Sequence, residues 1–358
     1  MLPYPVETLV PSRRRLLAAA PLAAALVLAA CSTGPAGGAS SAAVGATGDA
    51  AAFPVTVEHA YGTTTISSAP VRVATVGWAD ADTLVALGVV PVGAPRITWG
   101  GNEAGSTDWF DAAVADEDLD VSGMTRYDDS AGIPFDDIAA TRPDLVLGLS
   151  SGVTKEDYDK LSKIAPTVPW TEKAWGTSWQ EQVRTIGAAI GKEADAERLV
   201  IATEKTITDA VAAHPEVRGR SAAWAWFTPT DLSTIGLYTT SDLRPQMLRA
   251  FGFTDSPTVA QLSAKDPSAF TANLSAEKAA TLDADVVVFY AEAGAGAEEL
   301  RRNALIGQIP ALRDGHYVAS ADNEVALSMS LPSPLSVTTA VRDFLPKLVS
   351  ALRGEPAA

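Results

Sequence analysis

Cysteine and histidine are almost missing from this chain. Its 358 residues contain one cysteine, Cys31, and three histidines that lie far apart at positions 59, 214 and 316. A single cysteine excludes an internal disulfide and a zinc site made of several thiolates. Scattered histidines argue against direct capture of a transition-metal ion, which normally draws on clustered nitrogen and sulfur ligands. We therefore expect neither a metal site nor a cofactor in this protein.

Positive charge is also scarce. The formal net charge is −16, whereas a nucleic-acid-binding protein needs a basic face. We therefore expect no nucleic-acid partner. An acidic surface also keeps a domain soluble and away from anionic lipid. The phosphate-binding pattern GxxxxGK[ST] does not occur in the sequence, which argues against a nucleotide-cleaving core.

The N-terminus has the pattern of an export signal. Three arginines at 13–15 precede an apolar run that ends at Cys31. The run is about fifteen residues long, and a bilayer-spanning helix needs roughly 20. A basic segment before a short apolar run indicates a signal peptide, and the paired arginines fit the Tat route, with Sec still open. Small residues before Cys31 predict cleavage after Ala30 and a lipid anchor on Cys31.

These features predict the organisation of the chain. Residues 1–30 would be removed with three arginines and one glutamate, leaving a charge of −18. A lipid on Cys31 would hold the mature chain at the outer face of the cytoplasmic membrane. Residues 31–53 are rich in Gly, Ala, Ser and Thr, which predicts a flexible linker. About 300 residues then remain, more than one ordinary core, which indicates two lobes.

Strand-like and helix-like segments alternate through both predicted lobes. Strands are expected at 71–76, 89–93, 144–147 and 285–290, after a hairpin formed by 55–57 and 63–66. This alternation predicts an α/β fold of two Rossmann-like lobes with mainly parallel sheets and a ligand cleft between them. The predicted boundaries are 54–192 for the first lobe, 193–214 for one long connecting helix and 215–352 for the second lobe.

An internal echo links the two predicted lobes. Asp136 lies eight residues before Asp144, and Glu277 lies eight residues before Asp285. In each pair the first acid is near a helix start and the second leads a strand. Two lobes built on one plan would produce this repeat. Coincidence is the alternative, because acids favour helix starts in any case.

Aromatic and basic residues gather at the expected loops. Ligands of open α/β sheets bind outside the carboxyl ends of the strands, and tryptophan faces with a few cations suit a flat or anionic chelate. The candidate ligand-binding residues are Trp78, Arg96, Trp99, Arg126, Tyr127, Trp175, Trp226, Arg244 and Tyr290. For Trp179 and Trp224, core packing is the first expectation.

One enzyme motif is present. Residues 148–152 (GLSSG) match the GxSxG nucleophile elbow around Ser150, and His316 is late enough in the chain to be its base. The elbow requires a helix directly after the serine. Thr154 is instead a good N-cap, which predicts that the helix begins near Lys155. A lipid-anchored serine hydrolase therefore stays as an alternative that the position of this helix can test.

The chain resembles a known family over most of its length, from about residue 54 to residue 348. The segments that carry the resemblance are 57–66 (VEHAYGTTTI), 72–73 (RV), 86–93 (ALGVVPVG), 142–146 (RPDLV), 161–167 (LSKIAPT) and 332–336 (PSPLS). Their order and spacing resemble the iron-siderophore substrate-binding lipoproteins of ABC importers, which have haem- and cobalamin-binding relatives.

The resemblance implies a function. A protein of this kind, most simply a monomer, captures a ferric siderophore between its lobes and delivers it to an ABC permease. A haem or cobalamin receptor is the alternative with the same fold. In this family an acid on each lobe docks to basic residues of the permease, and Asp136 and Glu277 match by position, although Asp137 is adjacent to the first. A siderophore already fills the coordination sphere of iron, so the protein needs stacking surfaces and counter-charges in place of metal ligands.

Overall fold

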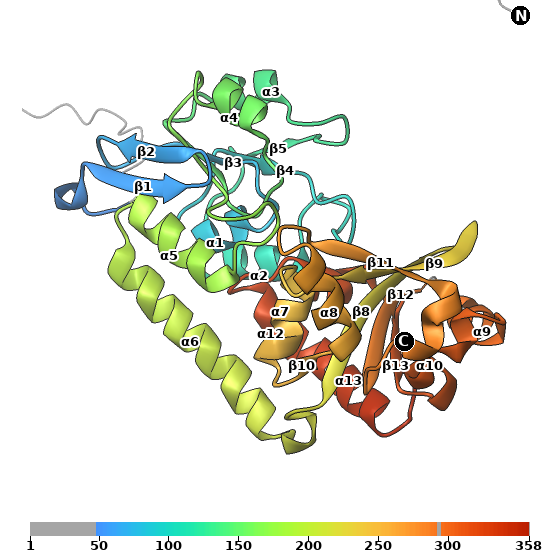
Figure 1. The fold of residues 1–358 in the computed structure, drawn as a ribbon. Helices are drawn as coiled ribbons and strands as arrows, with labels where there is room; N and C mark the ends of the chain where they lie inside the picture. The colour runs from blue at the N-terminus through green and yellow to red at the C-terminus, as the bar shows by residue number, and fades with distance from the viewer. Residues whose placement is uncertain (1–47, 292–294, 358) are drawn as a thin grey trace, which may run out of the picture. The chain divides into compact units, whose positions relative to one another are not determined.

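The computed structural model describes residues 48–291 and 295–357 (Figure 1). The predicted signal peptide and Cys31 lie outside the described residues, as does most of the predicted linker. The last residues of that linker are folded: Ala50–Ala52 form a short 3-10 helix, and the backbone N–H of Asp49 donates to the carbonyl of Gly191 (3.1 Å). The ordered chain therefore begins before residue 54, which corrects the predicted linker boundary.

Over the described residues, every helix is too short or too polar to cross a membrane.

The first lobe contains a parallel sheet with helices on both faces. An antiparallel hairpin comes first, formed by β1 (Val55–His59) and β2 (Gly62–Ile66). The five parallel strands follow the order β5 (Thr125–Tyr127), β4 (Gly93–Pro95), β3 (Val73–Thr75), β6 (Leu145–Gly148), β7 (Thr167–Pro169). The helices are α1 (Asp80–Ala86), α2 (Asp108–Asp116), α3 (Phe135–Ala140), α4 (Lys155–Leu161) and α5 (Trp179–Ala189). Strand β6 is apolar and buried at every position, as expected for a parallel strand covered on both sides.

One predicted strand of this lobe is displaced. The strand expected at 89–93 begins at Gly93 instead. The backbone N–H of Val89 still donates to Leu84 in the preceding helix (2.9 Å), and Pro91 has no N–H for a sheet ladder. The first ladder bond therefore comes from Val92, whose N–H donates to Val73 (2.8 Å).

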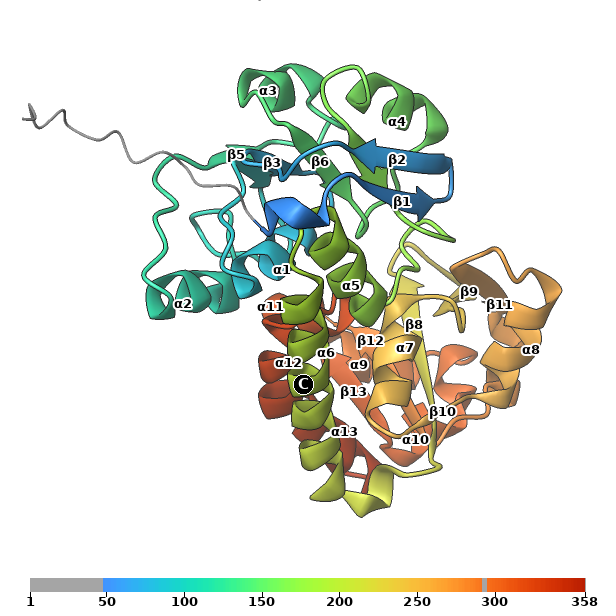
Figure 2. The same ribbon diagram turned by 90° about the vertical axis from the view of Figure 1, so that its left-hand side faces the viewer.

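A long helix, α6 (Glu193–Ala212), follows the first lobe. Its buried residues are spaced three or four apart, so they form one stripe along the helix: Ala196, Val200, Thr203, Ile207 and Val211. This stripe packs first on α5 and further along on the C-terminal helices α12 (Ser336–Thr339) and a π-helical turn (Ala340–Phe344), which continue into α13 (Leu345–Leu352). Figure 2 shows α6 lying alongside α12 and α13. The helix thus connects the two lobes.

The second lobe contains a mixed sheet. Its main order is β11 (Thr271–Ser275), β9 (Asp231–Tyr238), β8 (Ser221–Thr228), β12 (Val286–Tyr290), β13 (Tyr317–Ser320), with β10 (Thr254–Asp255) beside the start of β8. Strands β8, β10, β12 and β13 are parallel, whereas β9 is antiparallel to both neighbours. The alternation of strand and helix expected through this lobe fails after β8. The chain instead turns back through Pro229 and Thr230, which join β8 to β9.

Helices cover this second sheet as well. They are α7 (Leu243–Ala250), α8 (Pro257–Lys265), α9 (Ala295–Arg302), α10 (Pro310–Asp314) and α11 (Asn323–Ser330). The C-terminal residues also join the lobe, since the backbone N–H of Ala319 donates to Ala357 (2.8 Å). The second lobe therefore extends past residue 352, where the sequence had placed its end.

The two lobes have the same hydrogen-bond arrangement at one corner of the sheet, where an aspartate before one strand binds the start of the neighbouring strand. Asp144 accepts from the backbone N–H groups of Val71 and Arg72 (both 2.8 Å), where strand β3 is about to begin. Asp285 accepts from the backbone N–H and the hydroxyl of Ser221 (2.7 and 2.9 Å) at the start of β8. In both lobes the acid ahead of one parallel strand holds the beginning of its neighbour. This geometry favours the pseudo-symmetry that the sequence echo suggested.

Candidate ligand-binding cleft

A cavity of about 290 Å³ lies between the two lobes. Tryptophans from loops of the first lobe form one side, and residues of β9, α7, α11 and their loops form the other. The lining residues are Trp78, Trp99, Trp175, Tyr238, Asp242, Leu243, Arg244, Phe270, Leu327, Ser330 and Leu331. Four of the nine predicted ligand residues are therefore brought together here: Trp78, Trp99, Trp175 and Arg244.

Arg244 is the centre of the polar side of the cavity. Its Nη1 donates to both carboxylate oxygens of Asp242 (3.1 and 3.0 Å), and its Nε donates to the Tyr290 hydroxyl (2.6 Å). The guanidinium also lies 4.0 Å from the centre of the Tyr238 ring, within cation–π range. Burial disfavours the charged arginine, but Asp242 and the two tyrosines outweigh it, so the pKa of Arg244 is raised. The side chain is held charged and in one orientation.

The predicted residue Tyr290 borders this cluster. Its hydroxyl lies 2.9 Å from Ser330 Oγ, and its ring meets Trp99 edge to face at 5.4 Å between centroids. Trp99 belongs to the first lobe and Tyr290 ends strand β12 in the second. The pair therefore forms an aromatic contact between the lobes beside the cavity.

Two tryptophans are fixed by their own partners. The Trp78 indole N–H donates to Asp129 (2.8 Å), which sets the plane of that ring. Trp175 has a positive φ of 57°, and its backbone N–H donates to the carbonyl of Ser151 (3.0 Å). A bulky residue in the left-handed region is strained, and strain of this kind concentrates at binding sites. Its ring lies against Gly152, where a Cβ atom would come within 2.4 Å of the indole nitrogen.

Two predicted ligand residues lie elsewhere, and both assignments are corrected. Tyr127 is 1% exposed and fills the core beside Gly93, and burial raises its pKa to about 12. Arg126 donates to Ser106 (2.9 Å) and to the carbonyl of Pro95 (3.2 Å), and it stacks on the ring of Phe110. Both lie on β5 at the sheet edge, where contacts with the first lobe occupy their side chains.

The two remaining candidates lie outside the cavity lining. Trp226 is half-buried on β8, with its ring over Gly236 and 4.9 Å from the ring of the lining residue Tyr238. Arg96 directly follows β4 and is exposed. Trp179 and Trp224 are 3% and 0% exposed, which confirms that both belong to the core.

Other lobe-to-lobe contacts surround the cavity. The Lys173 ammonium donates to the carbonyl of Pro267 (2.6 Å) and to Ser241 (3.2 Å) in the second lobe. A further contact joins the C-terminal part of the chain to the first lobe. The Ser333 hydroxyl donates to Asp82 in α1 (2.7 Å), and Asp82 also accepts from the Trp109 indole (2.8 Å). Burial raises the pKa of Asp82 to about 6, while these two hydrogen bonds lower it.

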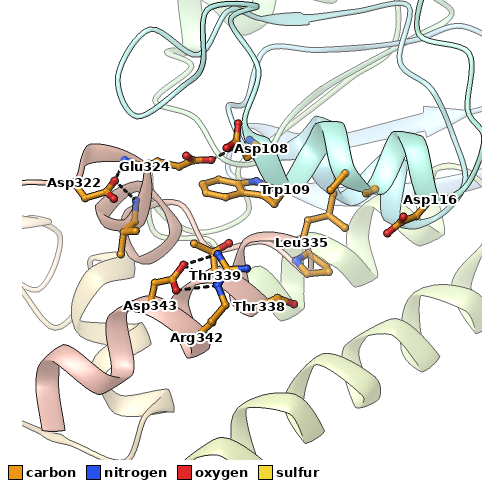
Figure 3. Close-up of a pocket in the computed structure, with 14 residues that line it drawn as sticks. Asp108, Trp109, Asp116, Asp322, Glu324, Leu335, Thr338, Thr339, Arg342 and Asp343 are labelled. Atoms are coloured by element: carbon orange, nitrogen blue, oxygen red, sulfur yellow. Dashed lines mark hydrogen bonds and ion pairs between the residues drawn. The ribbon is translucent and has the colours of Figure 1, made fainter.

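A second, larger hollow of about 670 Å³ lies between α2 and the α11–α12 region (Figure 3). Glu324 accepts there from the backbone N–H of Asp108 at the start of α2 (3.0 Å), and Arg342 pairs with Asp343 (2.5 Å). Acidic side chains dominate its rim, including Asp116 and Asp322. Trp109 is the one aromatic residue among the described residues that line this hollow, so the smaller cavity is the better candidate for a chelate.

The nucleophile elbow is not built at Ser150. Helix α4 begins at Lys155 with Thr154 in a capping box, as the sequence predicted, and four residues separate the serine from that helix. Ser150 is 2% exposed, and its backbone N–H donates to Asp80 (3.0 Å). His316 lies against the carbonyl of Ala351 at 2.8 Å, in the second lobe. These positions disfavour the serine hydrolase.

Asp80 has a structural role at the base of that loop. It accepts from the backbone N–H groups of Leu149 (2.9 Å) and Ser150 (3.0 Å) and from the Gln182 amide (3.0 Å). Burial raises the pKa of Asp80 to about 6, and the three donors oppose that rise. The carboxyl therefore ties α1, α5 and the loop after β6 together below the cleft.

Comparison with known proteins assigns this architecture. A protein-family model described as periplasmic binding protein matches residues 73–323 of this chain. The chain belongs to the periplasmic binding protein family. The match confirms the α/β fold of two lobes that the sequence predicted.

Three named proteins are similar to this periplasmic binding protein. The probable siderophore-binding lipoprotein YfiY of Bacillus subtilis is 26% identical over 247 residues, covering 68% of this chain and 71% of the relative. The crystal structure of PiaA from Streptococcus pneumoniae TIGR4 in complex with ferrichrome has a TM-score of 0.78 and 31% identity, covering 84% of this chain and 99% of PiaA. A periplasmic solute binding protein from Mycobacterium smegmatis has a TM-score of 0.68 and 27% identity, with 83% and 98% coverage.

The predicted docking acids of this periplasmic binding protein lie at helix starts. Asp136 is exposed in the first turn of α3, and Glu277 is exposed in the first turn of the 3-10 helix Ala276–Thr281. In the part of the chain that the structure describes, neither side chain forms a hydrogen bond or an ion pair. Asp144 and Asp285 follow them at the matching corners described above.

Several lining residues were missed from the sequence. They are Tyr238, Asp242, Leu243, Phe270, Leu327, Ser330 and Leu331. Asp242 caps α7 by accepting from the backbone N–H of Arg244 (2.9 Å), so its sequence pattern is that of an ordinary helix cap. Phe270 is 41% exposed beside the cavity, and only the tertiary structure shows it. Tyr238 ends β9, which runs antiparallel to its neighbours, so the rule for parallel strands does not reach it, and its place beside Arg244 comes from the tertiary structure.

Proposed function

We propose that this chain is an extracytoplasmic receptor that binds a ferric siderophore between its lobes and delivers it to an ABC importer. The observation that most supports this proposal is the cavity, in which tryptophan and tyrosine faces surround one oriented arginine. Among the described residues that line it, Asp242 is the one carboxylate, and it is already paired with Arg244. Such a site supplies stacking and hydrogen bonds to a preformed chelate and no ligand set for a bare ion. On this proposal the protein is a binding protein and not an enzyme.

The similarity to PiaA and YfiY supports the same ligand class. PiaA was crystallised with ferrichrome, and YfiY is named a probable siderophore-binding lipoprotein. Export and a lipid anchor at Cys31 belong to the proposal, as does action as a monomer. The mass of the protein extracted from membranes should correspond to a chain that begins at lipidated Cys31, without residues 1–30. A chain that still carries residues 1–30 would contradict the anchor.

Delivery would rest on the exposed acids Asp136 and Glu277. Each lies at a matching corner of its lobe and has no partner among the described residues, so each is available to a basic group of a permease. A carboxylate paired with a permease arginine forms a charge-assisted contact, which is stronger than a neutral hydrogen bond. One acid on each lobe would let the permease sense both lobes at once.

Intrinsic fluorescence tests the proposed binding. Trp78, Trp99 and Trp175 line the cavity, so a ferric siderophore bound there should quench tryptophan emission in a saturable way. Free ferric iron held in a weak buffer chelate should not. The matched control is Trp179→Phe, which alters a core tryptophan away from the cavity. Saturable binding of bare metal ions, or of haem or cobalamin in preference to every ferric siderophore, would contradict the proposal.

A further inference from the structure

The charged groups of the cavity neutralise one another. Asp242 and Arg244 are the two charged residues among the described residues that line it. Their side chains are 3% and 19% exposed, and Nη1 of the arginine contacts both carboxylate oxygens. The guanidinium therefore meets a ligand as a polar surface whose charge is already compensated. Nη2 is the nitrogen of this group for which the described residues supply no acceptor.

The charges next to the lining residues also balance. Arg96, which follows β4, is close to Asp128, the neighbour of Asp129 in the chain; the pKa of Asp128 is lowered chiefly by hydrogen bonds from Ser130 and to a smaller extent by Arg96. Asp129 accepts from the lining residue Trp78, and Lys173 donates to Ser241 beside Asp242. Together with the Asp242–Arg244 pair, these groups comprise three cations and three carboxylates. The site has no surplus of positive charge to meet a strongly anionic ligand.

The classes of ferric chelate differ most in charge. Three hydroxamates bound to ferric iron give a neutral complex, because each carries one negative charge. Three catecholates carry two negative charges each, and their ferric complex is a trianion. Moving a trianion from water into an apolar aromatic cavity without compensating charge is strongly unfavourable. The net charge of the whole chain, −16, adds repulsion at longer range.

On the basis of the proposed function, we propose that the cleft selects near-neutral ferric hydroxamate chelates over anionic catecholate ones. The stacking faces of Trp78, Trp99 and Trp175 contact the apolar body of the chelate. Nη2 of Arg244 donates to hydroxamate oxygens, which are polar without bringing excess charge. The Asp242–Arg244 pair sets this preference, because it leaves a donor in place and removes its net charge.

A panel of chelates tests the preference directly. Affinities for ferrichrome, a neutral trihydroxamate, and for a ferric tris-catecholate are measured with the wild-type protein by fluorescence quenching. The trihydroxamate should bind at least about 100-fold more tightly, a difference of about 2.7 kcal/mol. Equal or tighter binding of the tris-catecholate would overturn the preference while leaving siderophore binding itself intact. Binding of no chelate at all would overturn the proposed function and this inference with it.

A charge variant tests the cause. Asp242→Asn keeps an acceptor at the cap of α7 and leaves Arg244 with an uncompensated charge. The affinity ratio between the two chelates should then shift at least about tenfold toward the tris-catecholate. The matched control is Asp255→Asn, because Asp255 pairs with Arg249 at 2.8 Å and neither residue lines the cavity. An unchanged ratio in Asp242→Asn, or an equal shift in Asp255→Asn, would overturn the role of the pair.

Discussion

Replacing both Asp136 and Glu277 with alanine should nearly abolish siderophore uptake and leave siderophore affinity near that of the wild type. Both acids are exposed at helix starts and lie outside the cavity lining. An unpaired surface acid contributes little to folding, since even exposed ion pairs are worth about 0–1 kcal/mol. Against a permease arginine the same acid enters a partly desolvated contact, and truncating one partner of such a contact costs about 2–5 kcal/mol.

Two such losses, one on each lobe, should reduce receptor-stimulated ATP hydrolysis by the reconstituted importer about as strongly as uptake. Each single variant should give an intermediate rate. The matched control is the double variant Glu117→Ala, Glu299→Ala, which removes one exposed acid from each lobe away from these corners. Wild-type uptake by the Asp136, Glu277 double variant at limiting receptor would contradict the docking role. So would an equal loss of uptake in the control.

Replacing Arg244 with alanine should weaken siderophore binding at least about 30-fold and lower the free energy of unfolding by about 3 kcal/mol. The pair with Asp242 is buried, and removing one partner of a buried ion pair leaves an uncompensated charge at a cost of several kcal/mol. The same change removes the donor to Tyr290 and the cation over the Tyr238 ring. Urea unfolding and chelate titration measure the two effects separately.

A double variant separates the structural role of Arg244 from its role in binding. In Asp242→Asn, Arg244→Met the buried charge is absent altogether, so the free energy of unfolding should return to within about 1 kcal/mol of the wild type. Affinity for the chelate should stay low, because the guanidinium donor is still missing. If affinity recovers together with stability, Arg244 acts through the fold alone and does not contact the ligand.

The parts of the site that the sequence could predict are those that depend on local position. Trp78, Trp99 and Trp175 lie in loops of the first lobe, and ligands of α/β sheets bind at the loop edge of the sheet. Thr154 could be recognised as a helix cap because capping depends on residues within one turn. The buried strands β6 and β12 were visible as continuous apolar runs.

The parts that the sequence could not predict depend on side-chain direction and on distant packing. Arg126 and Tyr127 follow one another on an edge strand, and a strand sends successive side chains to opposite faces. Which contacts each one makes was set by Phe110, Ser106 and Gly93, none of which is local.

The cavity-lining residues of α11 could not be recognised from the sequence for another reason. Leu327 and Ser330 belong to a helix whose residues from Val325 to Ser330 are all buried, so nothing in its pattern separates a cavity wall from a core. The pairing of Asp242 with Arg244 likewise became informative only when Tyr238 and Tyr290 were seen to enclose the arginine.

The central claim, that this chain carries a preformed ferric chelate, is tested most directly by native mass spectrometry of the protein purified from iron-starved cells. The account predicts an added mass equal to one ferric siderophore, lost when Arg244 is replaced by alanine and retained when both Asp136 and Glu277 are replaced. An added mass equal to a bare metal ion, a haem or a corrinoid would contradict the account.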